Sequence, residues 1–197
     1  MPREKRRSGN REPPKRPARL TFRPVTTDNR GDFERLFASP GAPKHCWCMV
    51  WRRTPEEAKH NDGGSRKRQM LKRIGAGVPV GLLAYAGGEP VGWVSVAPRA
   101  SYRDLGGQPA EEAEAIWSIV CFFLPRRLRG QGTVRRLIAA AVDHARGEGA
   151  TLVEAYPVDE DAPSYRFMGF VSVFAEAGFT EVGRAGARRH VMRLETG

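Results

Sequence analysis

Glycines and arginines gather directly before a predicted helix in the stretch from Leu124 to Ala150, LPRRLRGQGTVRRLIAAAVDHARGEGA. The helix is expected over about 133–146, because apolar residues recur there at helical spacing. The first amides of a helix have no partner within it, and the helix dipole places partial positive charge at that end. Glycines let a ligand approach the backbone closely. The stretch therefore predicts an anion site suited to a phosphate or pyrophosphate.

The common phosphate-binding motifs do not fit this turn. The Gly-Lys-Ser/Thr end of a nucleotide-binding loop is missing, and Arg135 stands where the dinucleotide motif needs its third glycine. A tight turn from strand to helix, with no ligand, accounts for the bare pattern equally well.

Charge separates the chain into two parts. Residues 1–19 carry eight Lys and Arg against two Glu, so they hold +6 of the formal charge of +11. A segment with so little to bury is expected to be a disordered basic tail, and residues 20–197 are expected to form one domain. We favour a solvated tail over a nucleic-acid-binding one, and no nucleic-acid motif occurs elsewhere; any such contact would come from the tail.

Composition also bears on location. The basic start is not followed by an apolar stretch, so no signal peptide is expected. The longest apolar run, 116–124, is far shorter than the roughly 20 residues of a membrane-spanning helix. Three cysteines do not form a disulfide framework. These features predict a cytoplasmic protein that makes no membrane contact.

Strands and helices are predicted to mix along the domain, which gives an α/β (α+β) fold. Alternating or buried apolar runs predict strands over 19–25, 80–98 (a hairpin around Gly87-Gly88), 115–124, 150–158, GFTEV and RHVMRLE. Helices are expected after Thr27 or Asp28, from the Thr54 capping box, and over 65–74, 133–146 and 165–177.

The glycine–arginine turn resembles the pyrophosphate loop of the GNAT superfamily of acyl-CoA-dependent N-acyltransferases, whose motif is Arg/Gln-x-x-Gly-x-Gly/Ala. Arg127-x-x-Gly130-x-Gly132 matches it literally. Arg129-x-x-Gly132-x-Val134 ends in valine, but it aligns the following helix with that of the family, and we prefer it. TFRPVT, GEPVGWVSV and FAEAGFTEV extend the resemblance, in the family's order, from about residue 20 to 194.

The resemblance implies a mixed, mostly antiparallel sheet flanked by helices and splayed between its fourth and fifth strands. Acetyl-CoA would be the acyl donor, with no metal involved. Its pantetheine would pair with the backbone of Phe122, Phe123 and Leu124. Its pyrophosphate would lie on the amides of Arg129, Gly130, Gln131, Gly132, Thr133 and Val134.

An amine would then attack the thioester directly in a ternary complex, and much of the rate would come from positioning. The family's usual tyrosine acid falls at Phe174 and a common asparagine at Phe167, so neither group is present. Glu154 and Tyr156, on one face of a predicted strand, are the proposed catalytic substitutes, with Tyr165 a third option. A surface carboxylate and a packing tyrosine are the alternatives for the first two.

The segment HCWCMVW, residues 45–51, lies where the family builds one wall of the acceptor cleft. Trp47 and Trp51 would then contact a flat or apolar acceptor; the equal alternative is that both indoles cap the core. A metal site made of His45 and the three cysteines is disfavoured by the Cys-x-Cys spacing. The thiols are expected to pack against aromatic neighbours.

The sequence therefore predicts an N-acetyltransferase that acts on a primary amine of a small molecule or peptide. Because the usual acid is missing, a non-catalytic acyl-CoA-binding or sensing module is the alternative. A homodimer is compatible with the sequence.

Overall fold

The computed structural model of the protein describes residues 19–109 and 114–197. The predicted basic tail, apart from Arg19, lies outside the described residues. No helix within these two ranges combines the length and apolar character needed to cross a membrane.

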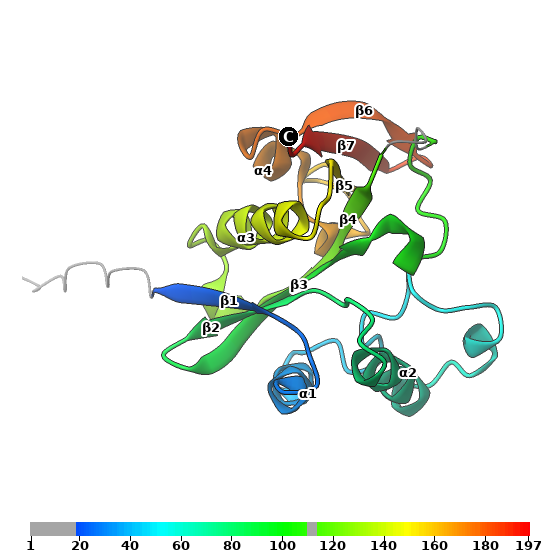
Figure 1. Ribbon diagram of the computed structural model, residues 1–197, viewed down its shortest axis with the longest axis vertical. Helices are drawn as coiled ribbons and strands as arrows, with labels where there is room; N and C mark the ends of the chain where they lie inside the picture. The colour runs from blue at the N-terminus through cyan, green and yellow to red at the C-terminus, as the bar shows by residue number, and fades with distance from the viewer. Residues whose placement is uncertain (1–18, 110–113) are drawn as a thin grey trace, which may run out of the picture.

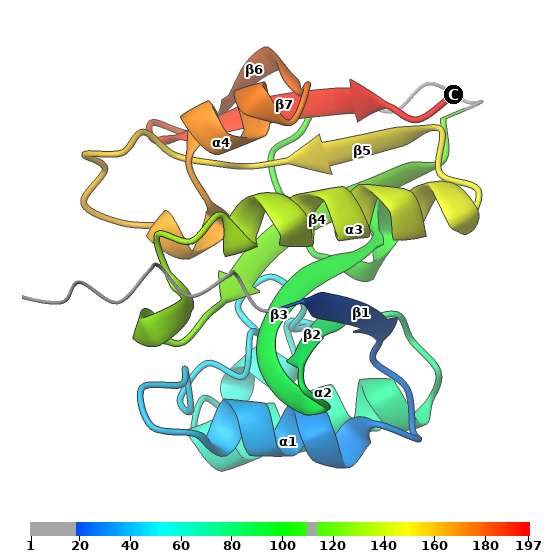
Figure 2. The ribbon, with the colours of Figure 1, turned by 90° about the vertical axis from the view of Figure 1, so that its left-hand side faces the viewer.

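Seven strands form one sheet in the order β1-β2-β3-β4-β5-β7-β6 (Figures 1 and 2). Only β4 and β5 pair in parallel, and every other pair is antiparallel. This confirms the predicted mixed, mostly antiparallel fold. The strands are β1 (Leu20–Pro24), β2 (Leu82–Ala86), β3 (Glu89–Pro98), β4 (Ile116–Phe123), β5 (Leu152–Ala155), β6 (Thr180–Ala185) and β7 (Arg189–Glu195).

Helices cover both faces of the sheet. On one face lie α1 (Arg30–Ala38) and α2 (Gly63–Gly75), and on the other lie α3 (Thr133–Gly147) and α4 (Val171–Glu176) (Figure 2). Single 3-10 turns occur at Glu57–Lys59, Arg99–Ser101, Arg126–Leu128 and Arg166–Met168.

The apolar residues of α3 recur at helical spacing and form one buried face. Leu137, Ile138 and Ala141 are fully buried against the sheet. Burial of each of the two larger side chains contributes about 1.5–3 kcal/mol. The helix ends at Gly147, one residue beyond the predicted end, and Gly149 follows with a left-handed φ of 85°.

The sheet splays between β4 and β5, as predicted. Their pairing ends at Ile119 and Ala155, while β4 continues to Phe123 paired with β3 alone. A bulge leaves Val120 without a partner in β3. Beyond β5 the chain passes through Pro157, which has no N–H for a ladder. The predicted strand over 150–158 is therefore shorter, and Val158 forms only isolated bridges to Phe170 and Arg189.

Two predicted helix starts were wrong in detail. The Thr54 capping box forms, with Thr54 N donating to Glu57 Oε2 at 3.0 Å and Glu57 N to Thr54 Oγ1 at 3.2 Å, but only the turn Glu57–Lys59 follows. Asp62 accepts from Ser65 N at 2.8 Å and starts α2, so the first helix has no room to extend. The first helix of the chain begins after Asn29, not at Thr27 or Asp28.

The predicted helix over 165–177 is broken in two. Tyr165 and Gly169 have positive φ values, and they flank the turn Arg166–Met168 before α4 begins at Val171. A Cβ at Gly169 would lie 2.8 Å from the ring of Phe174, so the chain passes too close to that ring for another residue. The break places Tyr165 and Phe167 at the surface beside the splayed strands.

Candidate functional site

A cavity of about 310 Å³ lies beside the half of β4 that has separated from β5. One wall is the β4 segment 120–123, and the other is formed by residues 41–51. The lining is mostly apolar, aromatic or thiol, with one cation: Gly41, Pro43, Cys46, Cys48, Val50, Trp51, Ser95, Tyr102, Val120, Cys121, Phe122, Phe123, Arg129 and Phe167.

The start of α3 presents free amides next to this cavity. Gly132 is the N-cap residue with a φ of 69° and makes no side-chain cap, and Gly130 has a φ of 71°. Within the described residues, the N–H groups of residues 130–134 donate no hydrogen bond to the protein. A Cβ at either glycine would meet no atom within 4 Å. The turn is therefore open to an anion, and its residues fit a diphosphate ligand.

The side chains of this region are held in place by the protein itself. Arg129 Nε donates to Leu124 O at 3.1 Å, and Thr133 Oγ1 donates to Leu128 O at 3.0 Å. Phe122 packs against Phe174, with ring centroids 6.1 Å apart, and Phe123 packs against Phe37 on the opposite face at 5.6 Å. The residues predicted to bind the coenzyme thus offer it mainly their backbone.

The structure brings Glu154 and Tyr156 together, but inside the protein. Both are fully buried, and the Tyr156 hydroxyl donates to the Glu154 carboxylate. Arg193 Nε donates to the same carboxylate at 2.9 Å. Burial and the neighbouring charge of Glu154 raise the pKa of Tyr156. A Cβ at Gly107 would lie 2.3 Å from Glu154 Oε1, so the preceding loop covers the pair, and neither residue lines the cavity.

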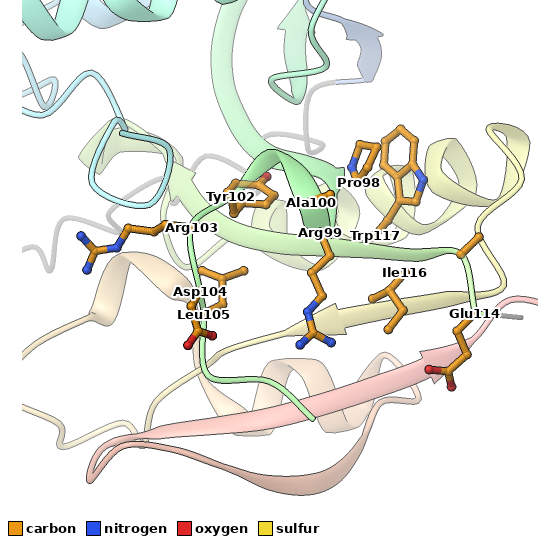
Figure 3. A pocket seen from close by; sticks show the side chains of 11 residues that line it. Pro98, Arg99, Ala100, Tyr102, Arg103, Asp104, Leu105, Glu114, Ile116 and Trp117 are labelled. Carbon is orange, nitrogen blue, oxygen red and sulfur yellow. The ribbon is translucent and has the colours of Figure 1, made fainter. Parts of the chain in front are cut away.

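A second, wider cavity of about 580 Å³ opens at the other end of β4 (Figure 3). The end of β3 at Pro98 and the residues that follow it, up to Leu105, form one side, and residues 114–117 form the other. Arg99 reaches Glu154 Oε1 at 3.6 Å from here. No residue predicted from the sequence as part of the site lines this cavity, whereas Tyr102 lines both cavities.

The two tryptophans proposed as acceptor contacts have different positions. Trp47 is buried under α1 and stacks on Phe37 at 5.5 Å, and it does not line the cavity. Trp51 does line it, and its ring lies 6.3 Å from that of Tyr165. Tyr165 in turn lies 6.2 Å from Phe167, whose side chain is 41% exposed. Trp51 and Phe167 line the cavity and Tyr165 lies against both rings, and we call these three residues the aromatic rim.

Sequence reasoning missed three buried polar residues, of which Ser95 and Tyr102 line the cavity and Arg52 lies behind them. Arg52, which is 3% exposed, donates to the Tyr102 hydroxyl at 2.7 Å and to Ser95 Oγ at 3.1 Å. The Tyr102 and Ser95 hydroxyls are 2.9 Å apart. These residues come from three distant segments, and no local spacing signals that they meet.

The thiols are also part of the wall. Cys48 Sγ and Cys121 Sγ lie 3.3 Å apart, and hydrogen bonds with the Cys121 and Cys46 thiols, together with burial, raise the pKa of Cys48 well above its usual range. Cys46 is only half-buried, and hydrogen bonds from Cys48 and from backbone amides lower its pKa to about 6. Among residues 19–109 and 114–197, no three His, Cys, Asp or Glu side chains are arranged to hold a metal ion.

Backbone strain is concentrated around the same cavity. Within the described residues, the non-glycine positions with positive φ are Trp47 at 45°, Cys48 at 50° and Tyr165 at 61°. Such conformations cost of order 1–3 kcal/mol each and persist where the surrounding structure holds them, often at functional sites. Here they shape the wall and the aromatic rim of the cavity.

Comparisons with known proteins agree with this geometry. The sequence model described as "Acetyltransferase (GNAT) family" matches residues 44–170. An acetyltransferase of that family from Desulfovibrio desulfuricans is 22% identical, with a TM-score of 0.50 and coverage of 91% of this chain and 100% of the other. None of the curated protein sequences compared with the chain matches it significantly.

Two further solved structures carry a coenzyme. YncA from Salmonella typhimurium, solved with acetyl-CoA, is 17% identical, with a TM-score of 0.53 and coverage of 90% and 94% of the two chains. The aminoglycoside acetyltransferase AAC(6')-Ib, solved with coenzyme A, is 18% identical, with a TM-score of 0.58 and coverage of 90% and 95%. At these identities the likeness shows a shared fold.

Proposed function

Because the chain belongs to the GNAT family of acetyltransferases, we propose that it transfers an acetyl group from acetyl-CoA to a primary amine in the cytoplasm. The observation that carries the proposal is the set of free amides at residues 130–134, next to a cavity along the half of β4 that has separated from β5. The amides would bind the pyrophosphate of the donor. The backbone of residues 122–124, at the end of β4 and just beyond it, would pair with its pantetheine, as in strand addition.

The acceptor would enter past the aromatic rim, between Trp51 and Phe167. An apolar rim suits an acceptor with a flat or apolar body, because such a body loses contact with water there. The amine nitrogen would attack the thioester carbonyl directly, with both substrates held side by side. Glu154 and Tyr156 then act indirectly, by holding β5 beside the site through their closed network with Arg193.

The assignment of the donor's pyrophosphate to the turn at 130–134 is tested by Gly132→Asp, with Gly132→Asn as the matched control. Both side chains tolerate the left-handed φ of 69° better than most residues, and both have open space to occupy. Only aspartate places a negative charge against the donor's pyrophosphate. We expect the Kd for acetyl-CoA, measured by calorimetry, to rise at least roughly tenfold more for aspartate than for asparagine, a difference of about 1.4 kcal/mol. Equal affinities in the two variants would refute the loop assignment.

A non-catalytic acyl-CoA sensor is the second candidate, and it is favoured by the position of Phe174. This residue is fully buried in the core and packs against Phe179 at 5.1 Å, so no proton donor exists at the family's usual place. Release of free thiol from acetyl-CoA separates the two candidates. An acetyltransferase releases thiol with one or more amines of a panel of amino acids, polyamines, aminoglycosides and peptides. A sensor binds acetyl-CoA and releases none with any of them.

A further inference from the structure

The acyl-transfer reaction needs a proton for the sulfur that leaves the thioester, and Phe174 cannot supply one. The wall of the 310 Å³ cavity contains a hydroxyl pair that can. Tyr102 and Ser95 both line this cavity, next to Val120 and Cys121 of the β4 bulge. Their oxygens are 2.9 Å apart, and the Tyr102 hydroxyl also faces Ser118 O at 3.4 Å.

A buried cation stands behind this hydroxyl. Arg52 donates hydrogen bonds to four oxygens, all of them neutral: Tyr102 Oη, Ser95 Oγ, Pro79 O and Val80 O. Its guanidinium also lies 4.1 Å from the centre of the Tyr102 ring. A positive charge in a buried site, with only neutral acceptors, stabilises negative charge that develops nearby. The oxygen best placed to take up that charge is the one on Tyr102.

We propose that Tyr102 is the general acid of the acetyl transfer, with its hydroxyl held by Ser95 and its charged form stabilised by Arg52. The inference rests on the proposed acetyl transfer. When the amine nitrogen bonds to the acetyl carbon, the carbon–sulfur bond breaks and its electron pair goes to sulfur. The Tyr102 O–H gives its proton to that sulfur, and Arg52 holds the phenolate. The proton lost by the amine returns through water to Tyr102, so coenzyme A leaves as the free thiol.

The protonation state of Tyr102 suits this role. Burial raises the pKa of the phenol, while the charge of Arg52 and the hydrogen bond with Ser95 oppose the rise. The proton is therefore present on Tyr102 at neutral pH. Burial, together with the charge of Arg73, lowers the pKa of Arg52, and its guanidinium remains a cation at neutral pH.

The test is Tyr102→Phe, with Tyr85→Phe as the matched control. The control substitution also removes a hydrogen-bonded hydroxyl, since the Tyr85 hydroxyl donates to Asp32 Oδ2 at 2.8 Å. Tyr85 does not line the cavity. We expect kcat with acetyl-CoA to fall by about 100-fold in Y102F, the lower end of the usual range for general acid catalysis, while the Kd for acetyl-CoA changes less than threefold. Y85F should keep the wild-type kcat.

A change of leaving group separates an acid from a structural role. An S-aryl thioacetate releases a more acidic thiol, which needs less help from a proton donor. The ratio of wild-type to Y102F rate should therefore shrink at least fivefold with the S-aryl donor. A structural defect would lower both rates equally, and such a result would overturn the proposal. Full activity of Y102F would do so as well.

A second substitution keeps the proposal testable if Tyr102→Phe destabilises the protein. Ser95→Ala keeps the phenol and removes one of its hydrogen-bond partners, so a smaller loss of about three- to tenfold with the same leaving-group dependence is expected. If the wild-type protein binds acetyl-CoA and transfers to no amine, the proposed function fails. If it transfers and both variants keep wild-type rates with both donors, only the role of Tyr102 fails.

Discussion

Cys46 differs from the other two cysteines in its local environment. The sequence predicted packing thiols, and Cys48 and Cys121 are buried in that way. Cys46, however, receives hydrogen bonds from the Cys48 thiol and from the amides of Cys48 and Val50, which lower its pKa to about 6. The strained backbone at Trp47 and Cys48 turns this segment back toward the sulfur. Position in a turn, and not residue type, sets this reactivity.

Cys46 is therefore expected to react with iodoacetamide as a thiolate at neutral pH. Because its pKa is lowered, the thiolate is present above about pH 6 and is lost as the pH falls below that value. The labelling rate, followed by peptide mass spectrometry, should rise with a midpoint near pH 6 for Cys46. Cys48, whose pKa is raised, should stay unlabelled at pH 7.

Acetyl-CoA provides the control for this reaction. Cys46 lines the cavity assigned to the acyl donor and acceptor, so a saturating concentration should slow its labelling at least severalfold. Cys46→Ser should remove the fast phase completely. A midpoint near the ordinary thiol value of about 8.5 would contradict the role given to the turn.

At the scale of elements, the segment 165–168 places an aromatic side chain at the edge of the cavity. Tyr165, at a φ of 61°, and the following turn hold Phe167 at the rim, 41% exposed to solvent. Large exposed apolar side chains within the described residues are Tyr165, Phe167 and Val182, so two of the three lie at this rim. Two adjacent exposed aromatic rings beside a cavity form an apolar patch of the kind that contacts ligands, and we expect this one to contact the acceptor.

Phe167→Ala should accordingly weaken the acceptor and not the donor. We expect the KM for an amine acceptor with an aromatic or apolar body to rise about fivefold to twentyfold, because an exposed ring contributes about 1–2 kcal/mol when a ligand covers it. The Kd for acetyl-CoA should change less than twofold. Steady-state kinetics at saturating acetyl-CoA measure the first effect and calorimetry the second.

Val182→Ala is the matched control for this change. Val182 lies on β6 with the same exposed fraction, 41%, and does not line the cavity. Its kinetic constants should equal those of the wild type. If F167A leaves the acceptor KM unchanged for every acceptor that turns over, the aromatic rim is not the entrance.

Elements with a strong local signal were predictable from the sequence, and elements fixed by distant contacts were not. The apolar period of α3 and the run of β4 placed both within two residues of their bounds. The Thr54 capping box was locally correct, yet Asp62 started a new helix too soon for the first to grow. The break at Gly169 comes from its contact with the Phe174 ring, which no local pattern reveals.

At the scale of the whole molecule, the cavity wall is assembled from segments that meet only in the folded protein. Arg52 follows the aromatic segment, Ser95 belongs to β3, and Tyr102 follows the turn after β3. The bulge at Val120 turns Cys121 toward Cys48, 73 positions away in the chain. The open turn before α3 was predictable because it is contiguous, and its role in binding the donor's pyrophosphate stays a prediction. The proposed acid was not, since a buried arginine is recognised only from its neighbours.

The formal charge is unevenly distributed over the whole chain, because residues 1–19 hold +6 of the +11. Binding of a protein to nucleic acid through lysine and arginine is mostly sequence-independent and weakens steeply with salt. Any oligonucleotide binding by the full chain is therefore expected to depend on this segment, whereas acetyl-CoA binding is expected to depend on the open amides at 130–134. A chain that lacks residues 1–18 should keep its unfolding temperature and its Kd for acetyl-CoA within twofold. Its affinity for a labelled 20-mer duplex at 50 mM salt, measured by fluorescence anisotropy, should fall at least tenfold. Retained affinity would show that the domain itself binds the duplex, and competition by acetyl-CoA would then place the duplex phosphates on the same amides.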